Sequence, residues 1–166
     1  MSDTAEESET VRRRRQELDT ILVAVGQEDR ERVVRLAEEA IAVAAAADAQ
    51  VVLAHVFTED EYDDVLDTLG IGAEAEVSTD GVAERHAATR DLTALLDEAD
   101  VEYTVRGAVG DHAEGIVAIA ENVGADRVIV GGRRRSPTGK AVFGSVAQEV
   151  LLSAPCPVTF VRGDTE

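Results

Sequence analysis

Short apolar runs alternate along the chain with segments in which apolar residues recur every three or four positions. The unbroken runs predict strands buried on both faces, as in the middle of a parallel sheet. Apolar residues three and four apart lie on one side of a helix and predict amphipathic helices. The strands predicted from unbroken runs span residues 21–25, 51–57 and 127–130, and residues 157–161 form the last predicted strand. The predicted helices span residues 33–44, 82–98, 112–123 and 145–153.

Two further segments have patterns of their own. Residues 101–106 alternate between apolar and polar side chains, which predicts a strand with one face in water at an edge of the sheet. Residues 58–80 are acidic and weakly periodic, and we interpret them as a mobile loop with one short helix. Gly124 is placed to end the helix before it. Ser145 and Gln148 have the spacing of a capping box at the start of the last helix.

Strands that alternate with helices predict an α/β fold, in which a parallel sheet is covered by helices on both faces. Ligands of such sheets bind beyond the carboxyl ends of the strands, where the strand order reverses. We therefore expect the function to lie in the loops at these ends. They are residues 26–28, residues 58 onward, residues 107–110 and residues 131–144.

The length of 166 residues favours a single domain. We place it at residues 19–162, between a charged N-terminal tail (1–18) and a short C-terminal tail (163–166). The N-terminal tail holds the run Arg12–Arg15 with acids on both sides, and we interpret it as a solvated arm rather than an RNA-binding one. Polar residues follow this run, so we expect no targeting segment.

The charge balance narrows the possible partners and the compartment. Asp and Glu number 34 against 16 Lys and Arg, a net charge of −18, and Lys140 is the one lysine. Such a chain repels itself at low ionic strength, and molar salt screens this repulsion, which predicts a halophilic protein of a high-salt cytoplasm. Nucleic-acid binding is disfavoured because it needs a basic surface. No apolar run approaches the ~20 residues of a membrane span, and the single Cys156 has no internal disulfide partner.

The turn after the fourth predicted strand reverses this charge. Residues 133–140 contain Arg133, Arg134, Arg135 and Lys140 and no acid. Glycines open the turn and allow a close approach of the backbone to a ligand. The turn closes at Gly144-Ser145, a predicted helix start whose free amides favour an anion. This segment therefore predicts a phosphate-binding loop.

The order of elements and this loop resemble the universal stress protein family over roughly residues 19–162. The family pattern after the fourth strand is Gly, two residues, Gly, nine residues, Gly, then Ser or Thr. Gly131, Gly144 and Ser145 match this pattern, whereas Arg134 stands at the second glycine. The segment Ala154–Val158 also resembles the usual end of the family.

The resemblance implies a doubly wound, Rossmann-like sheet of order 3-2-1-4-5 and a homodimer formed through Pro157–Val161. In the branch that binds ATP, an acid just after the first strand and backbone near the end of the second hold the adenosine. Here Gly26 and Val56 stand at those positions, so the acid is missing. The resemblance implies ATP or another adenine nucleotide as the ligand, and we expect no metal site. The implied nucleotide-binding residues are Val25, Gly26, Val56, Val130, Gly131, Arg134, Gly144, Ser145 and Val146.

Three functions stay open. The first is a regulatory module of the stress response that binds a nucleotide or phosphate. The second is a dimeric protein-interaction module without a nucleotide. The third, an enzyme that hydrolyses ATP, is weakest because no base or metal triad stands out. We interpret His55 as a packed, hydrogen-bonded residue, His86 as part of a helix, His112 and Ser145 as helix caps, and Cys156 as a small buried apolar residue.

Overall fold

A five-stranded sheet forms the centre of the computed structural model, which describes residues 18–72, 75–132 and 144–163. All neighbouring strands are parallel, and their order is β3-β2-β1-β4-β5. The predicted fold class and strand order are therefore confirmed, with strand ends shifted by at most three residues. The strands are β1 (Thr20–Ala24), β2 (Gln50–Phe57), β3 (Tyr103–Val109), β4 (Arg127–Gly132) and β5 (Val158–Arg162).

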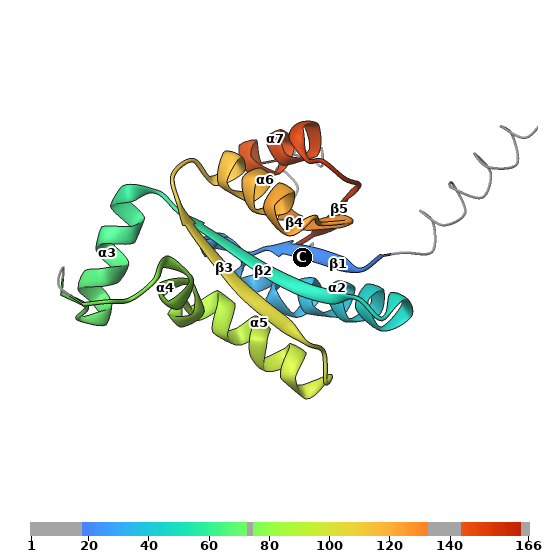
Figure 1. The fold of residues 1–166 in the computed structure, drawn as a ribbon, viewed down its shortest axis with the longest axis horizontal. Coiled ribbons are helices and arrows are strands. Elements are labelled where there is room, and N and C mark those ends of the chain that lie inside the picture. The colour runs from blue at the N-terminus through green and yellow to red at the C-terminus, as the bar shows by residue number, and fades with distance from the viewer. Residues whose placement is uncertain (1–17, 73–74, 133–143, 164–166) are drawn as a thin grey trace, which may run out of the picture.

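Helices cover both faces of the sheet, as Figure 1 shows. Successive side chains of a strand point to opposite faces, so Ile21 and Val23 of β1 join one core and Leu22 and Ala24 join the other. The first core lies under α2 and α5, and the second lies under α6 and α7. These helices are α2 (Val33–Ala47), α5 (Ala87–Glu98), α6 (His112–Val123) and α7 (Ser145–Ser153).

The strand β3 lies at one edge of the sheet, as its alternating sequence predicted. Its side chains alternate between half-buried and exposed through the first four residues, since one of its faces is only partly covered. Gly124 adopts the left-handed conformation at φ 63° and ends α6, also as predicted.

Residues 58–80 are more ordered than the prediction of a mobile loop with one short helix. They contain the 11-residue helix α3 (Glu59–Leu69) and the start of α4 (Thr79–Arg85). Thr58 and Glu61 form a reciprocal capping box, which satisfies two amides at the start of α3. Tyr62, together with Val65 and Leu66, packs against Phe57 and its neighbours. The local capping signal and this apolar stripe outweigh the acidic composition.

The prediction of one helix over residues 82–98 is wrong, because His86 separates α4 from α5. His86 is extended, with φ −65° and ψ 137°, and serves as the C-cap of α4 and the N-cap of α5. Its imidazole stacks on that of His55, with the ring centroids 4.2 Å apart. The tertiary contact thus coincides with the break in the helix. The described helices include none that is long and apolar enough to cross a membrane.

Candidate functional site

A pocket of about 360 Å³ lies at the carboxyl ends of the central strands. The chain leaves β1 toward α2 on one face, whereas the neighbouring strand β4 leads to α7 on the other face. Loops that diverge in this way leave a crevice, which is the general ligand position in doubly wound sheets. The short 3-10 helix η1 (Gln27–Arg32) connects β1 to α2 and forms part of the wall.

The structure brings together every predicted site residue that it describes. These residues come from the ends of β1, β2 and β4 and from the start of α7, and all of them line the pocket. Arg134 belongs to residues 133–143, which lie outside the described part of the chain. The eight lining residues are Val25, Gly26, Val56, Val130, Gly131, Gly144, Ser145 and Val146.

The start of α7 differs from the predicted capping box. Gly144 is the N-cap, Ser145 is already the first helical residue, and no side chain of residues 18–72, 75–132 or 144–163 caps the helix. The Gln148 N–H donates to the Gly144 carbonyl oxygen, so the helix begins at Ser145, as its predicted range has it, with Gly144 in the capping position expected of Ser145. Among the described residues, no side chain therefore accepts from the first-turn amides. Since the first turn also carries the positive end of the helix dipole, it favours a bound anion.

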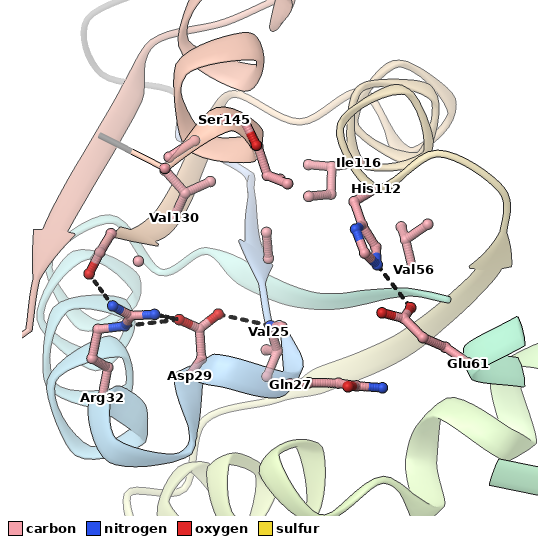
Figure 2. A pocket seen from close by; sticks show the side chains of 17 residues that line it. Val25, Gln27, Asp29, Arg32, Val56, Glu61, His112, Ile116, Val130 and Ser145 are labelled. Atoms are coloured by element: carbon pink, nitrogen blue, oxygen red, sulfur yellow. Dashed lines mark hydrogen bonds and ion pairs between the residues drawn. The ribbon is translucent and has the colours of Figure 1, made fainter. Parts of the chain in front are cut away.

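One wall of the pocket holds a carboxylate that the sequence analysis missed. Asp29 of η1 is 7% exposed. Its Oδ2 accepts the Gly26 N–H at 2.7 Å, and its Oδ1 accepts from Nε of Arg32 at 2.9 Å and forms an ion pair with Nη2 at 2.8 Å. Arg32 also donates through Nη1 to the Gly132 carbonyl oxygen at the end of β4. Figure 2 shows this connected group along one side of the pocket.

Two positions at the end of β4 have no room for a side chain. A Cβ atom on Gly131 would lie 2.7 Å from Asp29 Oδ1 and 3.1 Å from Arg32 Nε. A Cβ atom on Gly132 would lie only 1.7 Å from Cζ of Phe160 in β5. Gly131 thus makes room for the ion pair, and Gly132 makes room for the aromatic ring.

A second ionisable pair lies on the other side of the pocket. His112 Nε2, at the start of α6, lies 2.8 Å from Oε2 of Glu61 in α3. Burial alone would raise the pKa of Glu61, but hydrogen bonds from the Thr58 N–H and from His112 hold that pKa below its usual range. His112 is therefore not the helix cap that we expected. Asp111 is the N-cap and accepts the Glu114 N–H at 3.0 Å.

His55 matches its predicted structural role, and Cys156 matches its own in part, since it is packed on the core but only partly buried. His55 is 1% exposed, and its Nδ1 lies 2.5 Å from the Val25 carbonyl oxygen. Because a carbonyl oxygen only accepts, Nδ1 carries a proton. Cys156 is half-buried against the core under α6 and α7, and burial raises the pKa of its thiol. Within residues 18–72, 75–132 and 144–163 no three His, Cys, Asp or Glu side chains gather as metal ligands.

The charged pocket residues that sequence reasoning missed had only weak local signals. Asp29 and Arg32 are three residues apart, a spacing that places two side chains near each other on a helix. Glu61 has the spacing of a capping box with Thr58. Neither spacing indicates a pocket, because the contacts that bring these side chains to the site come from β4 and α6.

Comparisons with known proteins agree with this architecture. The sequence model of the universal stress protein family matches residues 17–162. A universal stress protein of Mycolicibacterium smegmatis is 35% identical over 79 residues, which are 47% of this chain and 61% of the relative. The chain thus matches less than two thirds of that relative's length.

Solved structures resemble the chain over most of its length. A universal stress protein of Archaeoglobus fulgidus has 27% identity and a TM-score of 0.58, with 86% of this chain and 97% of that chain covered. A protein of the same family from Arabidopsis thaliana, solved with AMP bound, has 17% identity and a TM-score of 0.59, with 89% and 93% covered. At 17% identity, the similarity to the Arabidopsis thaliana protein shows a shared fold.

Proposed function

Because the chain belongs to the universal stress protein family, we propose that it binds an adenine nucleotide in the pocket between β1 and β4 and acts as a regulatory module of a stress response. The observation that carries this proposal is the pocket's composition. Backbone of β1, β2 and β4 meets the uncapped start of α7 around one cavity. A relative of the same fold holds AMP, and this agrees with the choice of ligand.

The two ends of the nucleotide have different surroundings. The phosphates lie at the start of α7, where the helix dipole and first-turn amides that no described side chain caps attract an anion. The base lies toward Val56, where the end of β2 contributes apolar surface to the pocket. Glu61 and His112 border this apolar end. Binding of the nucleotide thus connects η1, α3, α6 and α7, and its presence or absence is the regulatory signal.

We infer that this module binds the nucleotide without transforming it. Asp29 is held by Arg32, and Glu61 is held by Thr58 and His112. In this arrangement both carboxylates act as hydrogen-bond acceptors. We expect ATP to be recovered intact after incubation with the protein, as measured by chromatography of the nucleotides.

Two measurements test the proposed nucleotide site. Mass spectrometry after heat release identifies any nucleotide that stays bound through purification. Calorimetry with AMP, ATP and GTP measures affinity in wild type and in Ser145→Glu, which places a negative charge in the pocket. We expect this variant to lose at least tenfold in affinity, because its carboxylate repels the phosphates.

Ser153→Glu is the matched control, since it introduces the same charge at the exposed far end of α7. Its affinity should stay within about twofold of wild type, because the distance and salt screen the charge. No nucleotide binding by the wild-type protein would exclude the proposed function. Equal losses in both variants would place the anion site elsewhere.

We also propose a homodimer through β5, and this dimer is the basis of the alternative function, a protein-interaction module without nucleotide. The strand β5 is the outer strand of the described sheet beside β4, and an open edge is a template for pairing. The Val128 N–H donates to the Pro157 carbonyl oxygen. Because alternate residues of a strand face opposite sides, the backbone of Val158 faces the open edge.

Val158→Pro removes an outward N–H and leaves the hydrogen bonds to β4 in place. Light scattering in molar KCl should detect a dimer for wild type and a monomer for this variant, with unchanged circular dichroism. A dimer that persists in the variant would place the interface on another surface. A dimer that binds no nucleotide would favour the alternative function.

A further inference from the structure

The carboxylate of Asp29, in the pocket wall, can accept one more hydrogen bond. An ionised carboxylate has about four acceptor positions. The Gly26 N–H uses one position on Oδ2, the Arg32 Nε–H uses one on Oδ1, and Nη2 of Arg32 lies 2.8 Å from the same Oδ1 as an ion pair. One position on Oδ2 is left for a further donor from the pocket, which Asp29 lines.

The surroundings hold this carboxylate in one orientation. Arg32 is itself tied to the Gly132 carbonyl oxygen, so the ion pair connects η1 with the end of β4. Gly131 adds no side chain, whereas a Cβ atom there would lie 2.7 Å from Oδ1. The acceptor is thus preorganised before any ligand arrives, and little conformational entropy is lost when it is used.

The charge of the pair indicates which kind of group it accepts. Arg32 compensates the carboxylate, and its five N–H groups are directed by the rigid guanidinium. A phosphate near Asp29 would meet a carboxylate oxygen, which has no proton to donate. A neutral hydroxyl group, by contrast, donates to the remaining position and introduces no charge. The anionic part of a ligand belongs at α7, and a hydroxyl-bearing part belongs at Asp29.

We propose that Asp29, positioned by Arg32, determines specificity by accepting a hydrogen bond from a ribose hydroxyl group of the bound nucleotide. This inference rests on the proposed nucleotide site. The chain has no acid at position 26, and the selective carboxylate comes instead from η1, three residues further along. The protein therefore prefers ribonucleotides to nucleotides that lack the accepted hydroxyl.

Calorimetry with AMP, 2′-deoxy-AMP and 3′-deoxy-AMP tests this preference on the full chain in molar KCl. The loss of one hydrogen bond to a charged acceptor should weaken binding of one deoxy ligand by about ten- to a hundredfold relative to AMP. In Asp29→Asn that ratio should fall to within about threefold. Arg32→Lys keeps the positive charge but lacks the planar guanidinium that orients Asp29, so it should also reduce this ratio.

The ratio of two ligands in one preparation does not depend on the fraction of folded protein, so it separates recognition from stability. Glu38→Gln, which removes a carboxylate from the exposed side of α2, is the control and should keep the wild-type ratio. If wild type binds AMP and both deoxy ligands equally, the inference is overturned while the nucleotide site stands. If wild type binds none of the three, both are overturned. An unchanged ratio in Asp29→Asn would also exclude Asp29 as the selective group.

Discussion

The imidazole of His55 connects the end of β1 to β2 behind the pocket. Its Nδ1 donates to the Val25 carbonyl oxygen, while its Nε2 is buried and has no hydrogen-bond partner among the described residues. Protonation of Nε2 would place an unpartnered N–H in the core. Burial and the neighbouring His86 therefore lower the pKa of His55 from 6.5 to about 4.

The lowered pKa predicts a loss of stability in mild acid. Below pH 6.5 the unfolded state takes up a proton that the folded state does not bind, so the free energy of unfolding falls until the pH reaches about 4. The full effect is about 3 kcal/mol. The pKa of His86 is also lowered by burial and acts in the same direction. Urea denaturation at several pH values in constant molar KCl measures this slope.

A His55→Leu variant separates His55 from the many carboxylates. It should be less stable at pH 7, because the bond to Val25 is lost, and its stability should change less between pH 6.5 and 5. Identical slopes in variant and wild type would show that His55 is not responsible.

Gly132 is the tightest glycine position at the sheet end. A Cβ atom there would lie 1.7 and 2.1 Å from two carbons of the Phe160 ring. Gly132→Ala should therefore displace the ring and lower the free energy of unfolding by about 1–3 kcal/mol. Gly72→Ala is the control, since a Cβ atom at Gly72 meets nothing within 4 Å, and its effect should be within about 0.5 kcal/mol. Chemical denaturation compares both variants, and equal stabilities would show that the Phe160 ring does not restrict the residue at position 132.

At the scale of elements, α4 protects the outer edge of β3. Asp80 in the first turn of α4 accepts the Gly107 N–H at 2.7 Å through Oδ1. A Cβ atom on Gly107 would lie 2.4 Å from the Thr79 carbonyl oxygen, so helix and strand are in close contact. An unpaired strand edge is a site of unwanted association, and this helix covers part of it.

Removal of the Asp80 acceptor should weaken this edge. Asp80→Ala leaves the Gly107 N–H without its partner and should cost about 1–2 kcal/mol in unfolding free energy. Asp80→Asn keeps an oxygen that accepts the same N–H, so it should lose less than half as much. The nearby Arg106 pair, at 3.8 Å and largely exposed, contributes little. Thermal melts of the two variants distinguish the hydrogen bond of Asp80 from its charge. Equal losses of stability in both variants would indicate that the charge matters instead of the hydrogen bond.

At the scale of the whole molecule, the net charge of −18 determines how stability depends on salt. Repulsion between the carboxylates destabilises the compact state at low ionic strength, and molar salt reduces the Debye length to ~3 Å. We expect the melting temperature to rise as KCl increases from low to molar concentration. Circular dichroism measures the midpoint, and sucrose of equal osmolality serves as the uncharged control. A midpoint that stays constant or falls with KCl would contradict the halophilic interpretation.

The sequence by itself determined the arrangement of the layers. The apolar runs at β1, β2 and β4 identified central strands, and the alternation at β3 identified an edge, because burial on two faces or one leaves different periodicities. The glycines of the loop after β4 and the start of α7 identified the end of the sheet where the pocket lies. These signals are local, and each reports the environment of its own segment.

Only the tertiary structure decided which side chains face one another across the pocket. Arg32 contacts Gly132 across 100 positions of sequence, and Glu61 contacts His112 across 51. The break at His86 likewise coincides with its stacking on His55 in β2. Periodicity records whether a residue is buried and not what buries it, so it specifies no partner in a distant segment. Asp29 is fixed in the site by Arg32, which also binds the Gly132 carbonyl oxygen of β4, and β4 lies beside β1 only in the folded chain.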